Sequence, residues 1–240
     1  MVCTAINLYS VRDLDVPMRE ILERCADAGY DGVQFAGDFG GLSTAAVSET
    51  LDELGLAVTD PHVDIEEMEA DAMSVAKTHG TMGAGGAVVP WLGAEHFETR
   101  EAAAATADRV GQLAASLADC GFLCHYHNHD HEFVDLGDTT GFEVFAEQTD
   151  VLLEPDVGWI ETAGHDPVDL LERYGDRIEV VHMKDMDDGE FCEIGDGDID
   201  MQACADAARE VGAKWLVYEH DQPQDPLASI DHGAQFLDGL

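Results

Sequence analysis

Short apolar runs alternate with longer amphipathic segments along the whole chain. The apolar runs have the length of buried strands, and the segments between them repeat apolar residues at helical spacing. We expect strands over residues 2–8, 32–36, 56–60, 86–89, 122–127, 151–154, 178–183 and 215–219. We expect helices over residues 16–28, 43–54, 65–79, 96–119, 141–148, 167–174, 200–211 and 226–238.

The regular alternation of strand and helix predicts the fold class. A strand that is followed by a helix and then another strand is typical of a parallel sheet with helices on its faces. Eight such units in an uninterrupted chain favour closure into a (β/α)8 TIM barrel, and we expect one domain over residues 1–240. An open, doubly wound sheet is the alternative fold.

The charge of the chain is extreme, with 51 acidic and 11 basic residues and a formal net charge of −40. A hydrophobic content of 45% argues against disorder, so we interpret the charge as adaptation of a halophilic protein to high salt. Salt at about 1 M shortens the screening distance to about 3 Å and weakens the repulsion between surface carboxylates. The same charge makes nucleic acid a poor partner, and we expect none, because phosphate binding needs basic patches.

Features of targeting and of oxidised compartments are lacking. Residues 1–16 contain no basic segment followed by an apolar one, so we expect no signal peptide. No apolar run reaches the length of a membrane span, so we expect no membrane partner. The six cysteines are scattered and include no CxxC pair, which indicates reduced thiols and a cytoplasmic location.

Residues that bind metals or transfer protons stand at the carboxyl ends of the last four expected strands. Side chains two apart in a strand share a face, so Glu154 lies on the face of Asp156. His182 and Glu219 occupy the ends of the next two strands. Strand ends of a barrel meet at one mouth, where active sites of this architecture lie. We therefore expect Asp156, His182 and Glu219 to converge.

The end of the fifth strand is rich in histidine. His125 and His127 share a face of this strand, and a loop with Glu132 follows. Carboxylates together with imidazole form a mixed oxygen and nitrogen site that suits Mn²⁺, Mg²⁺, Co²⁺ or Zn²⁺. We therefore expect one divalent metal ion at the mouth of the barrel.

Other polar and aromatic residues are candidates for contact with a substrate. Lys184 is one of only three lysines, which favours a role in the site over one on the surface. His62 follows the third strand and either contacts substrate or is a loop histidine. The residues expected to bind substrate are His127, Trp159, Gln34 and Asn7, with a purely structural role as the alternative for each.

The chain resembles the sugar phosphate isomerase/epimerase family, the xylose isomerase-like TIM barrels, over essentially its whole length. The segments that carry the resemblance are, in order, YDGVQFAG, YHNHDHEF, EPDVGWIETAGHDP, VVHMKDMDDGEFCEIGDGDID and VYEHD. Any one of them alone is a weak match, and their combined order is specific. The resemblance implies one divalent metal held by an acid after strand five, an Asp after strand six, a His after strand seven and a Glu after strand eight.

Carried over by residue, the last three implied ligands fall on Asp156, His182 and Glu219. The first falls on Glu132, with His127 as the alternative, because histidines stand where ketose epimerases of the family carry a glutamate. The motif HNHDHEF is closer to family members that resemble inosose dehydratases, hydroxypyruvate isomerases and other enzymes acting on keto-sugars.

The resemblance implies an isomerase or epimerase that removes a proton next to a carbonyl of a sugar or sugar phosphate, through a metal-bound enediolate. Glu132 or Glu219 would act as the base, and Lys184 and His62 would stabilise the developing charge on oxygen. A lyase that resembles inosose dehydratase shares the first step and is the alternative. An enzyme like the abasic-site endonucleases and a non-catalytic sugar-binding protein are remote alternatives. The expected partner is a small sugar, and a homodimer is left open.

Overall fold

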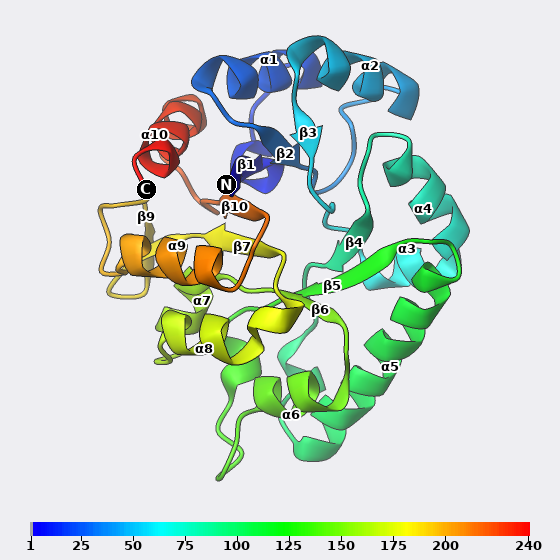
Figure 1. The fold of residues 1–240 in the computed structure, drawn as a ribbon, viewed down its shortest axis with the longest axis vertical. Coiled ribbons are helices and arrows are strands. Elements are labelled where there is room, and N and C mark those ends of the chain that lie inside the picture. The colour runs from blue at the N-terminus through cyan, green and yellow to red at the C-terminus, as the bar shows by residue number, and fades with distance from the viewer. Residues whose placement is uncertain (1) are drawn as a thin grey trace.

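Eight parallel strands form the centre of the molecule, which a computed structural model describes over residues 2–240 (Figure 1). They are β1 (Cys3–Asn7), β2 (Gly32–Gln34), β3 (Ala57–Val58), β4 (Gly86–Val89), β5 (Leu123–His127), β6 (Leu152–Glu154), β7 (Val180–Met183) and β10 (Trp215–Tyr218). One sheet has the order β3-β2-β1-β10-β7 and the other has the order β4-β5-β6. Parallel bridges from His62 to Val88 and from Asp156 to His182 join their edges and close the barrel.

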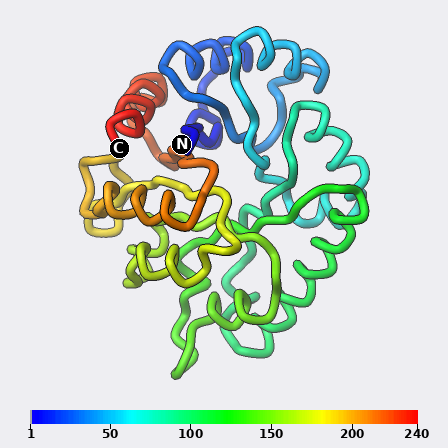
Figure 2. Tube along the Cα trace, in the orientation of Figure 1, coloured from blue at the N-terminus to red at the C-terminus, as the bar shows by residue number. Residues whose placement is uncertain are grey.

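Helices surround the strands in chain order. They are α1 (Met18–Ala28), α2 (Thr44–Leu54), α3 (Ile65–Ala70), α4 (Ala72–Gly80), α5 (Arg100–Ala118), α6 (Gly141–Gln148), α7 (Val157–Thr162), α8 (Pro167–Tyr174), α9 (Met201–Glu210) and α10 (Pro226–Asp238). The chain trace runs once round the ring, so that the red α10 returns beside the blue α1 (Figure 2).

Helix ends follow the local sequence. The Ser43 hydroxyl accepts a hydrogen bond from the Ala46 N–H and begins α2, and Thr140 and Glu143 form a capping box at the start of α6. Helix α1 ends at Gly29, whose φ of 102° lies in the left-handed region that favours glycine. These caps fix where each helix turns back toward the next strand.

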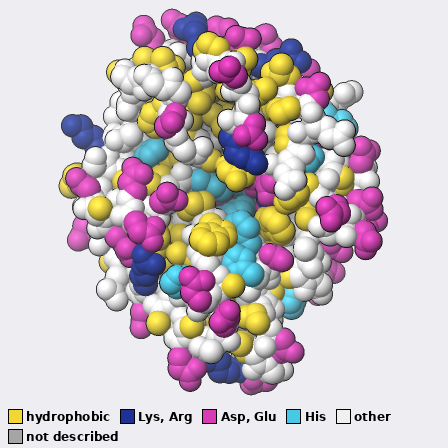
Figure 3. All heavy atoms as spheres, turned by 180° about the vertical axis from the view of Figure 1, so that it is seen from behind, with side chains coloured by type: hydrophobic (Ala, Val, Ile, Leu, Met, Phe, Trp, Pro, Cys, Tyr) yellow, Lys and Arg dark blue, Asp and Glu magenta, His cyan; other side chains and the backbone are white. Residues whose placement is uncertain are grey.

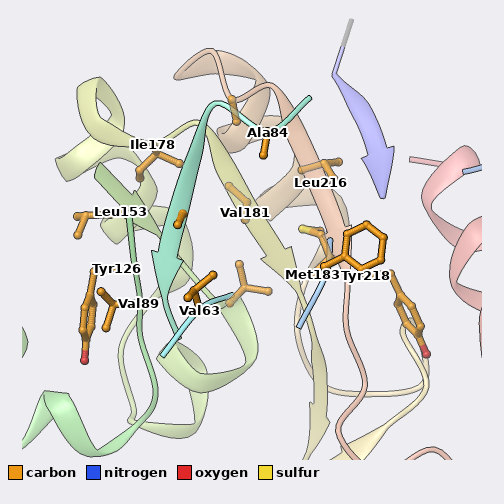
Figure 4. Close-up of a cluster of buried hydrophobic side chains, with 14 of the residues drawn as sticks. Val63, Ala84, Val89, Tyr126, Leu153, Ile178, Val181, Met183, Leu216 and Tyr218 are labelled. Atoms are coloured by element: carbon orange, nitrogen blue, oxygen red, sulfur yellow. The ribbon is translucent and has the colours of Figure 1, made fainter. Parts of the chain in front are cut away.

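The alternation of side chains along the strands separates two apolar regions. Leu153, Val181, Leu216 and Tyr218 belong to the main core between strands and helices (Figure 4). Inside the barrel, Ala5, Val180 and Val217 form a small second cluster with Trp215 packed against it. The inner face is therefore apolar at the amino ends of the strands and free to carry polar groups at the carboxyl ends.

The predicted (β/α)8 barrel is confirmed, and the alternative of an open sheet is wrong. The helix expected over 65–79 is divided at Asp71, whose extended backbone ends α3 and whose carboxylate accepts from the Ser74 N–H to start α4. A hairpin of β8 (Asp185–Asp187) and β9 (Glu190–Cys192) follows β7 and was not expected. Its turn uses Asp188 and Gly189, which both have positive φ. Over residues 2–240 no helix is long and apolar enough to cross a membrane.

Candidate functional site

Polar side chains fill the barrel interior at the carboxyl ends of the strands. His182 follows the inward-facing Val180 by two residues, and Glu219 follows Val217 in the same way, so both point into the barrel. The polar side chains buried in this layer are Asn7, Gln34, His127, Glu154, Asp156, His182, Lys184 and Glu219. Strand ends that are far apart in sequence thus supply one buried polar site.

Two overlapping groups of side chains could hold a metal ion. The mouth group consists of His127, Asp156, His182 and Glu219, and the inner group consists of His62, His127, Glu154 and His182. Within each group, one ligand atom per residue lies within 4.8 Å of all the others. Two imidazoles and two carboxylates, as in the mouth group, form a mixed donor set that suits a divalent cation.

The Glu154 carboxylate is the centre of the inner hydrogen-bond network. Its Oε1 lies 2.6 Å from His62 Nε2, 3.0 Å from His182 Nε2 and 3.4 Å from His127 Nδ1. Its Oε2 accepts a hydrogen bond of 2.8 Å from Gln34 Nε2. Asn7 Nδ2 in turn donates to Gln34 Oε1 at 2.8 Å. The ends of β1, β2, β5, β6 and β7 are therefore tied to one carboxylate.

The two shared histidines bridge the groups through opposite ring nitrogens. His182 directs Nε2 toward Glu154 and places Nδ1 2.9 Å from Glu219 Oε2. His127 directs Nδ1 toward Glu154 and places Nε2 3.7 Å from Asp156 Oδ2. Each imidazole therefore keeps one nitrogen for the mouth group while the other faces a buried carboxylate.

Lys184 is the one lysine in this layer, and three carboxylates surround it. Its Nζ lies 2.9 Å from Asp156 Oδ2, 3.1 Å from Glu219 Oε2 and 3.2 Å from Asp221 Oδ1. Burial lowers the pKa of Lys184, but the three carboxylates outweigh it and hold the pKa well above its ordinary value. The ammonium also lies 5.0 Å from the centre of the Trp159 ring. Lys184 is thus a permanent buried cation of the site.

The two histidines of the mouth group differ in charge. Burial lowers the pKa of His127 to about 4, and the neighbouring His182 acts in the same direction. Burial also lowers the pKa of His182, but Glu154 and Glu219 outweigh it and raise the pKa to about 10. The neutral imidazole of His127 and the carboxylates of Asp156 and Glu219 are therefore ready to coordinate a cation.

A cavity of about 880 Å³ adjoins the mouth group. Its lining includes His62, His127, Lys184, Glu219 and Asp221. On the face opposite to that of Figure 1, histidine side chains gather in a central hollow that hydrophobic and acidic side chains surround (Figure 3). A ligand of small-molecule size can therefore reach the mouth group from solvent.

The family model of the xylose isomerase-like TIM barrel matches residues 22–240. The chain belongs to this family. Within it, the chain is similar to the rhizopine catabolism protein MocC of Rhizobium meliloti, at 26% identity over 87% of this chain and 76% of that protein. It is also similar to the inosose dehydratase of Clostridium botulinum, at 29% identity over 54% of this chain. That match spans about half (51%) of the dehydratase.

Solved structures of this barrel family share the fold. A sugar phosphate isomerase/epimerase from Parabacteroides distasonis superposes with a TM-score of 0.83 at 22% identity, covering 99% of this chain and 94% of that one. An L-ribulose 3-epimerase superposes with a TM-score of 0.76 at 16% identity, covering 99% of this chain and 94% of that one. Identities this low show the common fold alone.

The structure brings most of the predicted site residues of this xylose isomerase-like barrel together. Asp156, His182 and Glu219 meet in the mouth group, and His127 joins them there. His62 and Lys184 line the cavity, and Trp159 lies against Lys184. Gln34 and Asn7 are fully buried and bind the polar network, with neither among the residues that line the cavity.

Glu132 is the predicted residue that the structure does not bring to either group. It lies in a short 3-10 helix (His131–Phe133) beyond β5, where the alternation of the strand no longer applies. Its Oε1 accepts a hydrogen bond of 2.8 Å from the Tyr126 hydroxyl, and its Oε2 accepts one of 2.7 Å from the His129 N–H. His127, on the strand itself, occupies the place in the mouth group that the sequence assigned to Glu132.

Glu154 is the central residue that sequence reasoning did not select. The available signal was its position two residues before Asp156, which puts both carboxylates on the inner face of β6. The sequence could not show that three imidazoles converge on it, because His62, His127 and His182 come from three other parts of the chain. Asp221, two residues after Glu219, lies against Lys184, a contact that the sequence did not predict.

Glu132→Gln should change the pH dependence of stability without loss of metal binding. Burial raises the pKa of Glu132 to about 7 from an ordinary 4.5, which outweighs the hydrogen bonds from Tyr126 and His129. A raised pKa in the folded state makes the wild type lose stability as pH rises from about 4.5 to 7, by about 3 kcal/mol in all. The glutamine cannot ionise, so at high pH the free energy of unfolding of the variant should exceed that of the wild type by that amount.

Denaturant unfolding of both proteins between pH 4.5 and 8, at constant molar salt, measures this difference. We expect nearly equal stability at the acidic end and a more stable variant at pH 8, with one metal bound per chain in both. Parallel pH profiles, or loss of metal in the variant, would contradict this placement of Glu132.

Proposed function

We propose that this protein is a divalent-metal-dependent isomerase or epimerase of keto-sugars. The observation that carries the proposal is the mouth group of His127, Asp156, His182 and Glu219, which lies at the edge of a cavity of about 880 Å³. Its donor set is compatible with Mn²⁺, Mg²⁺, Co²⁺ or Zn²⁺. Membership of a family whose relatives include sugar epimerases and a dehydratase supports a small polyhydroxylated substrate.

The residues present fit such an ion. A metal about 2.1 Å from each donor places the donors no more than about 4.2 Å apart, close to the spacing of the mouth group. Two carboxylates offset the charge of a divalent cation, and His127 has a neutral ring. His182, whose pKa is raised to about 10, would release its proton when a metal binds. When bound, the ion would polarise a substrate carbonyl and make the neighbouring C–H acidic.

Glu219 is the proposed base. It is the carboxylate of the mouth group that lines the cavity, so its oxygen can reach a substrate proton. Lys184, 3.1 Å from Glu219 Oε2, keeps this carboxylate ionised and lines the same cavity. Its ammonium can donate a hydrogen bond to the substrate oxygen on which negative charge develops. His62 lines the same cavity and can orient a substrate hydroxyl.

Glu154 would position the two histidine ligands. A histidine that binds a metal through one nitrogen commonly donates its other N–H to a carboxylate, which fixes the ring and its tautomer. Glu154 lies beside His182 Nε2 and His127 Nδ1, so both rings would present the opposite nitrogen to the mouth group. One carboxylate therefore serves two ligands.

A dehydratase is the alternative reaction. It begins with the same proton removal and then loses a hydroxyl from the next carbon, so the same residues would serve. The similarity to an inosose dehydratase, at 29% identity, favours this alternative over the other lyases. Product analysis separates it from isomerisation.

Solvent exchange tests the proposed reaction. The metal-loaded protein, incubated in D₂O at molar KCl with a panel of keto-sugars, should place deuterium at a carbon next to the carbonyl. Glu219→Gln keeps an oxygen for the metal but cannot accept a proton, so exchange should fall by at least about 10² with metal occupancy verified. Glu179→Gln, beyond the amino end of β7, is the matched control and should exchange normally. Absence of exchange with every sugar would refute the reaction, and normal exchange in Glu219→Gln would refute the base.

Metal affinity tests the role of Glu154. Loss of such a supporting carboxylate typically weakens metal binding about 10–100-fold, and loss of a ligand weakens it further. Titration with Co²⁺, followed by its visible absorption, should therefore rank wild type above Glu154→Gln and Glu154→Gln above Asp156→Asn. The reverse order for the two variants would place the ion in the inner group.

A further inference from the structure

The cavity is larger than a single sugar requires. Its volume of about 880 Å³ is near the upper end of the range for pockets that enclose drug-sized molecules, about 300–1,000 Å³. A hexose has about twelve non-hydrogen atoms and fills only part of such a space. The lining also includes a mostly apolar set, Phe39, Leu42, His79, Pro90 and Trp91, which we call the outer lobe.

The side chains around the cavity disfavour an anion. Among the described lining residues, Lys184 is the single lysine or arginine, and three carboxylates already surround it. The carboxylates that line the cavity are Asp38, Asp64, Glu67, Glu219 and Asp221. Arg12 lies near the rim, where it stacks on Tyr9 and donates to the backbone carbonyls of Tyr9 and Asp221. Phosphate recognition needs a free cationic fork or ammonium, which this lining does not offer.

The backbone amides that could replace a cation are also occupied. In barrels of this architecture, phosphates frequently bind the loops after the seventh and eighth strands. Here the Gly195 and Gly197 N–H groups, in the loop after β7, donate to Asp185 Oδ2 at 2.7 and 3.1 Å. The Met186 N–H donates to Asp185 Oδ1 at 2.9 Å. These three amides are therefore taken by an internal carboxylate and are not free to bind a phosphate.

Aromatic side chains at the cavity are unusually exposed. Tyr9 and Trp91 are 42% and 59% exposed, and both line this cavity, although most large apolar side chains of the chain are buried. Exposed apolar surface beside a polar cleft is typical of a ligand site. The flat faces of Trp91 and Phe39 suit the apolar face of a ring, and nearby carboxylates can accept hydrogen bonds from hydroxyls.

We infer that the cavity takes an uncharged, unphosphorylated glycoside whose sugar ring carries a free ketone, with that sugar at the mouth group and the ring of its aglycone in the outer lobe. The placement of the sugar, and not the aglycone, at the mouth group rests on the proposed function. The distal ring is recognised by apolar contact with Trp91, Phe39 and Leu42. A phosphate on the sugar is rejected, because it would lie among carboxylates with no unpaired cation.

Binding of matched ligands tests the inference. Several hexoses are each compared as the methyl glycoside, the phenyl glycoside and the 6-phosphate, by calorimetry with the Mn²⁺-loaded protein in molar KCl. The glycosides have no free carbonyl and therefore measure binding without turnover. For the sugar that fits, the phenyl glycoside should bind about tenfold or more tightly than the methyl glycoside, because the added ring is removed from water. The phosphate should bind at least about tenfold more weakly than its parent sugar.

Variants identify which side chains cause the tighter binding of the phenyl glycoside. Trp91→Ala and Phe39→Ala should each remove most of the advantage of the phenyl glycoside while the methyl glycoside is little affected. Met73→Ala is the control, because Met73 is 62% exposed and is absent from the cavity lining. Equal binding of methyl and phenyl glycosides, no binding of any phenyl glycoside at millimolar concentration, or preference for the phosphate would each overturn the inference.

These measurements are separable from the test of the reaction. Glycoside binding requires no turnover, so a phenyl advantage without deuterium exchange would leave the inference standing and remove the proposed reaction. Deuterium exchange with small keto-sugars, without tighter binding of the phenyl glycosides, would leave the proposed reaction standing and refute the inference.

Discussion

Buried charge is the constraint on which the barrel mouth depends. Glu154, Asp156 and Glu219 are almost completely inaccessible, and a buried carboxylate is costly unless it is paired. Lys184 and the charged imidazole of His182 supply the pairing, and each of them contacts more than one carboxylate. Removal of a single partner would leave an uncompensated buried charge and destabilise the fold. The same contacts therefore stabilise the barrel and hold the side chains of the site. A divalent cation in the mouth group would add to this balance.

The alternation of side chains along the strands brings these charged groups together inside the barrel. Outward side chains such as Val181 and Leu216 pack in the main core, whereas the alternate positions face inward. The inner face is closed by Val180 and Val217 at one level and becomes polar one step later, at His182 and Glu219. Closure through the bridges of His62 and Asp156 then brings all the strand ends together.

The same periodicity explains what the sequence could predict. The eight units and the convergence of Asp156, His182 and Glu219 follow from alternation and parallel order, so both could be expected before the structure. Glu132 could not be placed, because it lies beyond the strand, where a turn and not the pleat sets its direction. The role of Glu154 was hidden for another reason, since contacts among four separate segments define it. The hairpin after β7 left only the weak signal of an Asp-Gly turn.

The location of the metal tests the account most directly. A crystal soaked with Mn²⁺ and measured at the manganese absorption edge would show the ion by its anomalous scattering. The account predicts one peak in contact with His127, Asp156, His182 and Glu219, with Glu154 beyond contact distance. A peak bound to Glu154 and His62, or no peak in the barrel at saturating Mn²⁺, would contradict it.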